Sequence, residues 1–405
     1  MNNNKNLFDI NIEIYRGKIY CEILKYFISI LINLFGKKIF SIKKPYQKTL
    51  TNLLSSWMFN LYLLYDLNND QFFPDKFDDT TILKNILLDF CKYDTQIENK
   101  EEKIDNVLKE FITFIYTQID NLQNYKQSDL YNNVKYKYNL YKIKIKQKRN
   151  NIDVLFYKYK IDLLYNIKDI RLKNILENIL IPNDIYIKMV NNYNNNMEFI
   201  DIYIWIIIFR YQLLGSNNHQ LAILPKIIKN MEKNYNLSFE CFASAINTSQ
   251  KNYCSIFYDI EKYFGSHGNF FNFTPTEGTF SCNPPYEKEI IYKCIYKIFN
   301  HLEYSNNKKY KLTFIITIPI WDIEGQKLIN QKQHKIDYGD FDIIQKIKES
   351  KYFIGLRMIL KENFTYIDHN FKLYKNKTIQ NTYIIILSTN NINFNHILEY
   401  NFFNI

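Results

Sequence analysis

The chain has 405 residues, of which 47% are apolar and 23% charged, values that fit a globular protein and exclude collagen, a coiled coil and wholesale disorder. By ordinary domain sizes, this length predicts two or three domains. Lys and Arg (52) outnumber Asp and Glu (41), and the net charge of +11 favours a polyanionic partner such as nucleic acid or an anionic membrane surface. An A+T-rich coding sequence would produce the same excess of lysine, so both explanations stay open.

The cysteines and the apolar runs indicate in which cellular compartment the protein is expected. The six cysteines show neither a Cys-x-x-Cys pair nor a spacing suited to zinc, which is typical of reduced intracellular thiols, and we expect no metal. The first residues lack the layout of a signal peptide, and the longest apolar runs, 26–35 and 202–209, are shorter than the ~18 residues of a membrane span. We therefore expect a soluble, intracellular monomer that does not bind membranes.

The first half of the chain carries apolar side chains at helical spacing, as in Tyr20, Ile23 and Phe27. Only two glycines occur in residues 1–190, which argues against hairpin turns there. Residues 1–195 are therefore predicted to form a helical domain.

One basic segment, residues 134–149, alternates lysine with tyrosine and isoleucine. In a strand, this period of two places the lysines on one face, whereas a helix would spread them around its surface. Such a face could follow the phosphates of single-stranded RNA and stack rings on its bases, or it could be an ordinary solvated surface. The lysines are Lys135, Lys137, Lys142, Lys144, Lys146 and Lys148.

From residue 237 onward, short β-rich runs alternate with Gly- and Pro-containing loops and with a helical stretch at 287–302. This alternation predicts an α/β sheet domain, residues 196–405, joined to the helical domain by a helix at 199–214. The predicted strands are 237–243, 278–282, 314–320, 353–360 and 382–388.

The tetrapeptide Asn283-Pro284-Pro285-Tyr286 carries the clearest chemical signal. It follows a predicted strand and precedes a helix, so it lies where open α/β sheets bind ligands. A purine amine is a poor nucleophile because its lone pair is delocalised into the ring, and an Asn oxygen that accepts its N–H group helps to localise that pair. The prolines fix the loop, and the aromatic ring stacks on the base and faces a methyl sulfonium.

Taken alone, the tetrapeptide fits adenine N6 methylation and protein glutamine N5 methylation equally well. The usual glycine-rich cofactor loop is missing, because no Gly-x-Gly occurs. Asp259 is either a ligand for ribose hydroxyls or a simple loop acid, and Trp321 is either a stacking platform or a core aromatic. Glu240 is expected to be structural.

Several short blocks extend the signal beyond the tetrapeptide. They are Arg210-Tyr211, 221–225, Phe239-Glu240-Cys241-Phe242-Ala243-Ser244, Tyr253-Cys254-Ser255, Tyr263-Phe264-Gly265-Ser266, Gly278-Thr279-Phe280, 314–321 and Asn381-Thr382. In this order and spacing they resemble the phosphorylated CTD-interacting factor 1 family, the cap-specific adenosine N6-methyltransferases.

The resemblance implies a Rossmann-like methyltransferase domain behind a helical domain, S-adenosyl-L-methionine as donor, and a capped mRNA whose first transcribed nucleotide is 2′-O-methyladenosine. The family's motif ends in Phe, so we expect Tyr286→Phe to be tolerated. The site residues that follow are Asn283, Pro284, Pro285 and Tyr286 for catalysis; Phe242, Ala243, Ser244, Asp259, Asn283 and Tyr286 for the donor; and Glu287, Lys288, Glu289, Pro319, Trp321 and Asp322 for the substrate.

The chain departs from the family in two places. The family carries paired acids after its motif, and Lys288 stands where an acid would help to hold the cap guanine. The paired tryptophans of the family's WW module are missing, so we expect no binding to a phosphorylated polymerase tail through it. The resemblance implies a nuclear protein, and without that module a cytoplasmic one is also consistent.

Two functions remain open. The predicted one is an active RNA adenine N6-methyltransferase, and the alternative is a catalytically silent RNA-binding or scaffold relative. The intact tetrapeptide favours the first, because a silent relative has no chemical need for it. Protein glutamine methylation accounts for neither the basic segment nor the flanking blocks.

Overall fold

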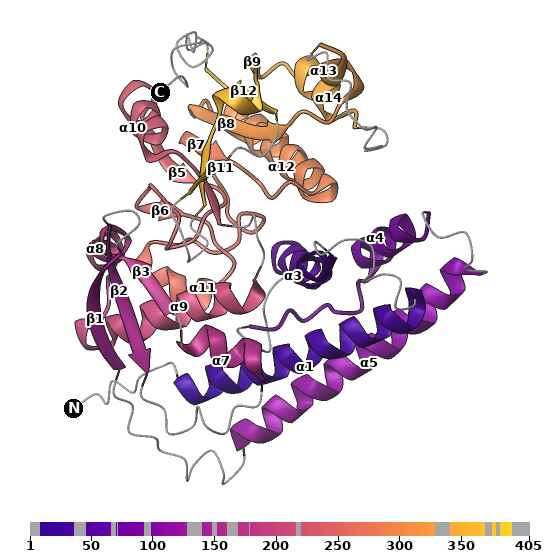
Figure 1. Cartoon of the computed structure of the whole chain (residues 1–405). Helices are drawn as coiled ribbons and strands as arrows, with labels where there is room; N and C mark the ends of the chain where they lie inside the picture. Colours follow the sequence, from indigo (N-terminus) through magenta and orange to yellow (C-terminus); the bar gives the residue numbers. More distant parts are fainter. Residues whose placement is uncertain are drawn as a thin grey trace. The chain divides into compact units, whose positions relative to one another are not determined.

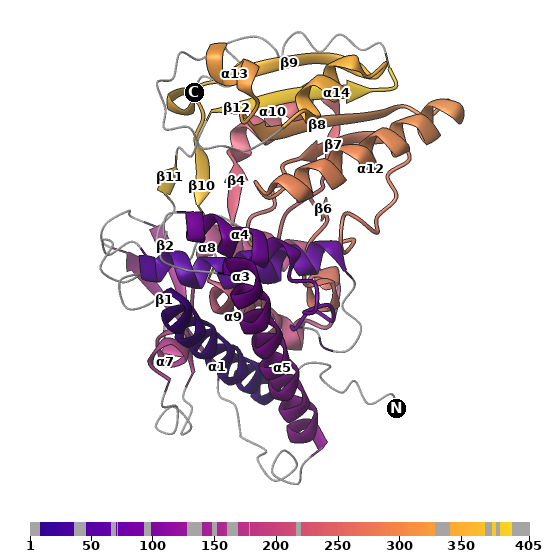
Figure 2. The same cartoon turned by 90° about the vertical axis from the view of Figure 1, so that its right-hand side faces the viewer.

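The structure is a computed structural model of the chain, drawn in Figure 1 and, after a 90° turn, in Figure 2. It forms two compact units, Met1–Asn217 and Asn218–Ile405, whereas the sequence-based division at 195/196 falls earlier in the chain. None of the helices in the described part of the chain meets the length and hydropathy needed to span a bilayer. The described residues are 9–35, 46–65, 70, 72–92, 99–127, 140–147, 152–159, 169–177, 179–215, 220–328, 341–368, 375–377 and 381–390.

The first unit is largely helical, as its hydrophobic spacing predicts. α9 is apolar on all sides, and nearly all of its side chains are buried, so it forms part of the core. A Cβ at Gly17 would lie 2.8 Å from Leu172 and 2.9 Å from Phe209, so this glycine allows α1 to approach α7 and α9 closely. The helices are α1 (Ile10–Phe35), α3 (Tyr46–Leu64), α4 (Thr81–Lys92), α5 (Lys100–Gln127), α7 (Ile170–Glu177), α8 (Asn183–Asn192), η2 (Met197–Phe199) and α9 (Ile200–Leu214).

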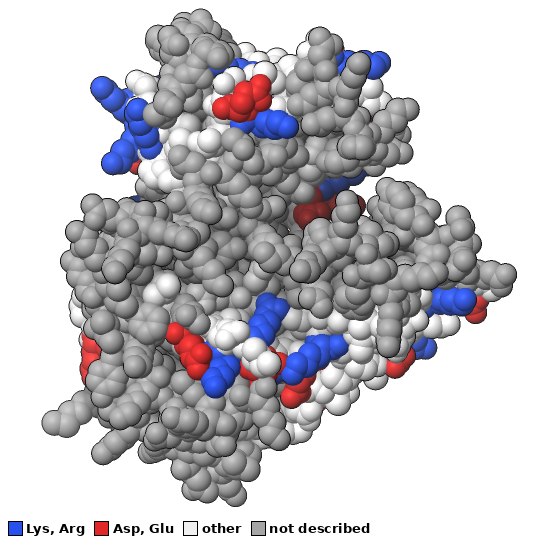
Figure 3. All heavy atoms as spheres, in the orientation of Figure 1, with Lys and Arg blue, Asp and Glu red and all other residues white. Residues whose placement is uncertain are grey.

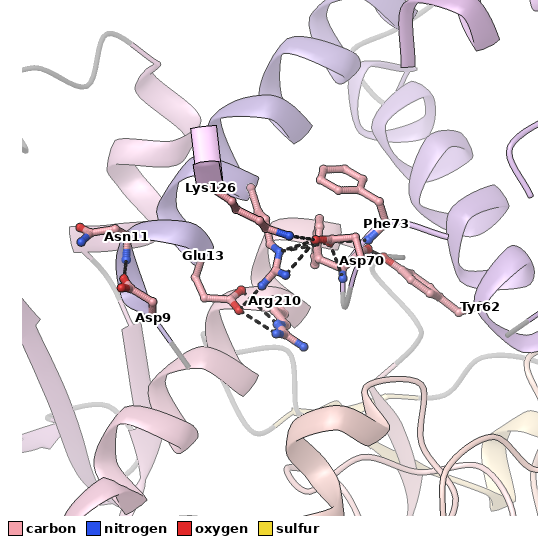
Figure 4. Close-up of polar contacts among 10 residues, drawn as sticks. Asp9, Asn11, Glu13, Tyr62, Asp70, Phe73, Lys126 and Arg210 are labelled. Atoms are coloured by element: carbon pink, nitrogen blue, oxygen red, sulfur yellow. Dashed lines mark hydrogen bonds and ion pairs between the residues drawn. The ribbon is translucent and has the colours of Figure 1, made fainter. Parts of the chain in front are cut away.

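A network of four buried charged side chains and the half-buried Lys126 joins α1, α5 and α9 (Figure 4). Arg16 donates to Glu13 at 2.5 Å and to Asp70 at 2.8 Å, and Arg210 donates to Glu13 at 2.7 Å. Lys126 adds a contact of 2.9 Å to Asp70. Both acids are therefore paired with two cations each, which is the condition under which buried charges are tolerated.

The first unit also contains a three-stranded antiparallel sheet, which the helical prediction missed. β1 (Leu140–Gln147) pairs with β2 (Ile152–Tyr159), and β2 pairs with β3 (Ile179–Pro182). The alternating lysines do form a strand, which places Lys142, Lys144 and Lys146 on one face of β1. The pairing of β1 with β2 and of β2 with β3 places Ile179 and Ile181 of β3, which are both buried, on the same face of the sheet. Lys135, Lys137 and Lys148 lie outside the described residues.

The positive net charge does not gather into one patch on the face drawn in Figure 3. Over most of this face the described Lys and Arg side chains lie beside Asp and Glu, whereas a group of blue side chains at the upper left has almost no red beside it. Elsewhere in the chain, exposed ion pairs such as Lys84 with Asp105, at 2.7 Å, show the same intermixing.

The second unit is built from two sheets and the helices that accompany them. The strands of the main sheet are β5 (Leu237–Glu240), β6 (Asn252–Tyr253), β7 (Gly278–Cys282), β8 (Leu312–Pro319), β9 (Phe353–Ile359) and β12 (Thr382–Ser388). A smaller antiparallel sheet contains β4 (Leu221–Ile223), β10 (Tyr366–Asp368) and β11 (Lys375–Lys377). The helices are α10 (Pro225–Tyr235), α11 (Tyr258–Glu261), η3 (Lys262–Phe264), α12 (Lys288–Asn307), α13 (Ile323–Leu328), α14 (Ile343–Glu349) and η4 (Lys361–Asn363).

The main sheet has the order β6-β5-β7-β8-β12-β9. Neighbours from β6 to β8 are parallel, and β12 runs antiparallel to β8 and β9. Ile316 of β8 packs in a core with α12, while Ile315 packs in a second core with α10, so both faces of the sheet are covered. This explains why β8 is buried at every position and reads as a continuous apolar run. The predicted Rossmann-like α/β fold is confirmed.

Candidate active site

The chain changes direction within the main sheet between β5 and β7. After β5 it moves outward to β6, and after β7 it moves the opposite way to β8. The loops after β5 and β7 thus diverge at the carboxyl ends of these strands, where open α/β sheets bind ligands. Asn283 directly follows the last residue of β7, so the tetrapeptide lies at this point, as expected.

A small, partly open cavity lies at this divergence. Two predicted site residues, Phe242 and Asn283, line it together, although one follows β5 and the other β7. The remaining lining residues are Leu221, Ala222, Ile223, Ile228, Glu240, Asn247 and Ser281.

The side-chain oxygen of Asn283 is the distinctive atom of this cavity. It is buried and has no hydrogen-bond partner, whereas buried polar atoms in folded proteins are nearly always satisfied. Thr279 and Ser281 precede Asn283 at alternate positions of β7, so the three share one side of the sheet. An unpartnered acceptor facing a cavity is suited to a ligand that donates an N–H group.

The ring of Tyr286 is held by two contacts. Its hydroxyl lies 2.7 Å from that of Tyr366 on β10, and its ring lies edge-on to Trp321 with 6.3 Å between centroids. Burial raises the pKa of Tyr286 to about 12, and the hydrogen bonds with Tyr366 and Thr382 offset only part of that rise. The hydroxyl therefore stays protonated near neutral pH and cannot act as a base.

The three residues after the tetrapeptide do not line the cavity. Burial raises the pKa of Glu287 to about 7, and the charge of Glu289 adds to the rise. Lys288 Nζ lies 5.9 Å from the ring centroid of Tyr292, a cation–π contact on α12. Their role in substrate binding stays a prediction.

The loop after β5 is held by hydrogen bonds within it and to neighbouring segments. Ser244 donates its hydroxyl to Gln220 at 2.8 Å and its N–H to Asn247 at 2.7 Å. The N–H of Ala243 donates at 2.9 Å to the carbonyl of the residue after β6. Phe242 is therefore the one predicted donor-loop residue that reaches the cavity.

The end of β8 places the predicted substrate loop outside the cavity lining. Pro319 is the last residue of β8, and Trp321 is buried in the core on the α12 side. Asp322 accepts hydrogen bonds from the Tyr383 hydroxyl and the Gly325 N–H, both at 2.9 Å. These bonds fix the start of α13.

Sequence reasoning missed Asn247 and Ser281 and gave Glu240 a structural role only. Glu240 both lines the cavity and accepts the N–H groups of residues 249 and 250, at 2.6 and 2.9 Å. The alternation on β7 could have placed Ser281 beside Asn283, whereas Asn247 lies in an irregular loop that gives no such signal. Asp259 lies half-buried in α11 and does not line the cavity.

Four buried cysteines belong to the core on the α12 side. Two of them, Cys282 and Cys294, have sulfurs 3.3 Å apart, and burial raises the pKa of Cys241 to about 11. Protonated thiols are poor nucleophiles and poor metal ligands. Across the described ranges, no group of three or more His, Cys, Asp or Glu has a geometry that could hold a metal ion.

Part of the chain is similar to known proteins. The family model described as "Phosphorylated CTD interacting factor 1 WW domain" matches residues 182–368, which include α9, the cavity and the tetrapeptide. Two relatives, from Mus musculus and Homo sapiens, are named mRNA (2'-O-methyladenosine-N(6)-)-methyltransferase and are 33% and 32% identical over 124 residues. Each match covers 29% of this chain and 17% of the relative, so the matched segment spans a small part of their length. Residues 182–368, somewhat less than half of the chain, are thus similar to the phosphorylated CTD interacting factor 1 family.

Proposed function

We propose that the chain is an RNA adenine N6-methyltransferase that uses S-adenosyl-L-methionine as its donor. The observation that carries the proposal is the buried, unpartnered oxygen of Asn283 in a cavity at the divergence of β5 and β7. The names of the two relatives support the reaction class. They also suggest the target, the 2′-O-methyladenosine next to the cap of mRNA, which we include in the proposal.

The donor would be held by Phe242, Asn247 and Asn283. An aromatic ring, two amides and the carboxylate of Glu240 border an apolar wall, a combination that suits a cationic molecule with polar substituents. When bound, S-adenosyl-L-methionine supplies an electrophilic methyl group on a sulfonium. The free acceptor at Asn283 is the feature that fits a ligand best.

The residues of the tetrapeptide act by positioning and electrostatics. Asn283 accepts one N–H of the adenine amine, which localises the lone pair on the nitrogen. Pro284 and Pro285 restrict the loop and so limit the movement of that acceptor. The ring of Tyr286 stacks on the base and excludes water, while its neutral hydroxyl takes no part in proton transfer.

A catalytically silent RNA-binding relative is the second candidate. The observation that favours it is the loop after β5, in which Ala243 and Ser244 use their polar groups within the chain. Such a protein would bind RNA and leave it unmethylated. It would not need the acceptor that Asn283 provides.

The decisive experiment incubates the chain with methyl-labelled donor and four RNAs, capped or uncapped and starting with A or with G. The proposal requires label on the N6 position of A-starting RNA, and the proposed target requires preference for the capped form with a 2′-O-methyl group. RNA binding without label on any substrate, together with absence of donor binding in calorimetry, would establish the silent relative instead.

A further inference from the structure

Tyr366 lies outside the tetrapeptide but is bonded to it. Its side chain is 1% exposed, and its hydroxyl lies 2.7 Å from that of Tyr286. Thr382 of β12 forms a side-chain hydrogen bond with each of these two hydroxyls. Since a hydroxyl donates one hydrogen bond and accepts two, the three groups can satisfy one another in a closed buried cluster.

This cluster joins the two cores across the carboxyl-terminal edge of the sheet. The ring of Tyr286 packs against the core that contains α12, whereas Tyr366 belongs to the core that contains α10. Phe364 adds an edge-on ring contact to Tyr366, with 4.8 Å between centroids. The hydrogen bond therefore ties the tetrapeptide loop to side chains on the opposite face.

Tyr366 also stands in register with the wall of the cavity. β10 pairs with β4 so that Tyr366 lies opposite Ile223, and all three residues of β4 line the cavity. Tyr366 itself does not line it. Any influence of this residue on a ligand must therefore pass through Tyr286 or through β4.

The chemistry of the pair limits its role. Burial raises the pKa of Tyr366 well above its ordinary value, so neither hydroxyl ionises near neutral pH. A neutral hydroxyl pair can hold two groups in place and cannot exchange a proton with a base at that pH. The Phe that ends the family's motif, by the resemblance stated above, could not form this bond.

We infer that Tyr366 is a positioning residue, which holds the ring of Tyr286 through the hydroxyl pair and couples the tetrapeptide loop to the β4 wall of the cavity. The expected effect on methyl transfer rests on the proposed function. The coupling between the tetrapeptide loop and β4 rests on the contacts alone. It also refines the expectation for Tyr286→Phe, which becomes a loss of a few-fold.

The catalytic test compares Tyr366→Phe, Tyr286→Phe and the double variant in methyl transfer to A-starting RNA. Loss of one net hydrogen bond lowers kcat by about 2- to 10-fold in each single variant. The double variant is no slower than the singles, because all three lack the same bond. The matched control is Tyr352→Phe, which loses a hydroxyl bonded to Glu303 at 2.6 Å before β9 and should leave kcat unchanged.

A second test needs no activity. Amide hydrogen exchange of the ligand-free chain should accelerate at residues 283, 286 and 287 and at 221–223 of Tyr366→Phe and Tyr286→Phe, and stay unchanged there in Tyr352→Phe. Unchanged exchange in both segments, or additive losses of kcat in the double variant, would overturn the inference. Accelerated exchange in a chain that methylates no RNA supports the coupling and refutes the proposed function, so the two failures are distinguishable.

Discussion

Each unit contains buried polar side chains, and the two units differ in whether these side chains have hydrogen-bond or charge partners. In the first unit, Glu13 and Asp70 each meet two cations within 2.9 Å. In the second unit, the oxygen of Asn283 is buried and meets no partner. A buried polar group left without a partner costs about 1–3 kcal/mol of stability. The charged network serves the fold, and the free acceptor is the atom to which the proposed function assigns a ligand.

The largest effect is expected from Glu13→Gln in the network. The substitution leaves the buried guanidinium of Arg210 without its charge partner, and removal of one member of a buried pair typically costs about 3–5 kcal/mol. Chemical denaturation of this variant and of a control measures the loss in the free energy of unfolding. Asp105→Asn, which disrupts an exposed pair with Lys84, is the control and should cost at most about 1 kcal/mol. Equal losses would contradict the structural role of the network.

The next effect concerns catalysis and leaves the fold intact. Asn283→Ala should lower methyl transfer by on the order of 10²-fold, because a preorganised hydrogen bond to the reacting group is lost. Its free energy of unfolding should not fall through a lost hydrogen bond, since the oxygen has no partner in the fold. Asn306→Ala on the exposed surface of α12 is the control for both measurements. A destabilised Asn283→Ala would show that this side chain belongs to the fold.

Acid should weaken the network through Asp70. Burial by itself raises the pKa of this carboxyl, but the charges and hydrogen bonds of Arg16 and Lys126 outweigh that effect and lower the pKa to about 2. Because the folded pKa lies below the ordinary value, the stabilisation is present above about pH 4 and is lost as the pH falls toward 2. The contribution is about 2 kcal/mol at neutral pH. Denaturation curves between pH 2 and 6 measure it, and Asp70→Asn should lack this part of the slope.

The smallest effect is expected from the lysines of the basic segment, and it tests whether the first unit contains an RNA-binding surface in addition to the charged network. Replacement of Lys142, Lys144, Lys146 and Lys148 by Gln should weaken RNA binding with little change in donor affinity. Each lost phosphate contact should flatten the slope of log affinity against log salt by about 0.7. Gln at the exposed lysines 308, 309 and 311 is the matched control. An unchanged slope would mean that the strand lysines only solvate the surface.

Several strands of the second unit could be predicted from the local pattern of apolar residues. β8 and β12 are continuous apolar runs because both faces of the sheet are covered, and such runs are visible in a sequence. The place of Asn283 after a strand followed from its neighbours in the chain. In the first unit, the scarcity of glycine suggested helices alone, and β1 to β3 formed nevertheless, because alternation of Lys with Ile also fits a strand.

The sequence by itself located the strands β5, β7, β8, β9 and β12 and the helix α12 of the second unit and singled out the tetrapeptide as the candidate site, since periodicity and turn residues are local properties. Only the tertiary structure decided that Phe242 and Asn283 share a cavity, that Glu13 pairs with Arg210, and that Tyr286 is bonded to Tyr366. These pairs join residues far apart in the chain, and strand order and helix packing bring them together. A hydrogen bond between two buried hydroxyls, or its absence at an amide, depends on distances of a few ångströms that no local pattern encodes.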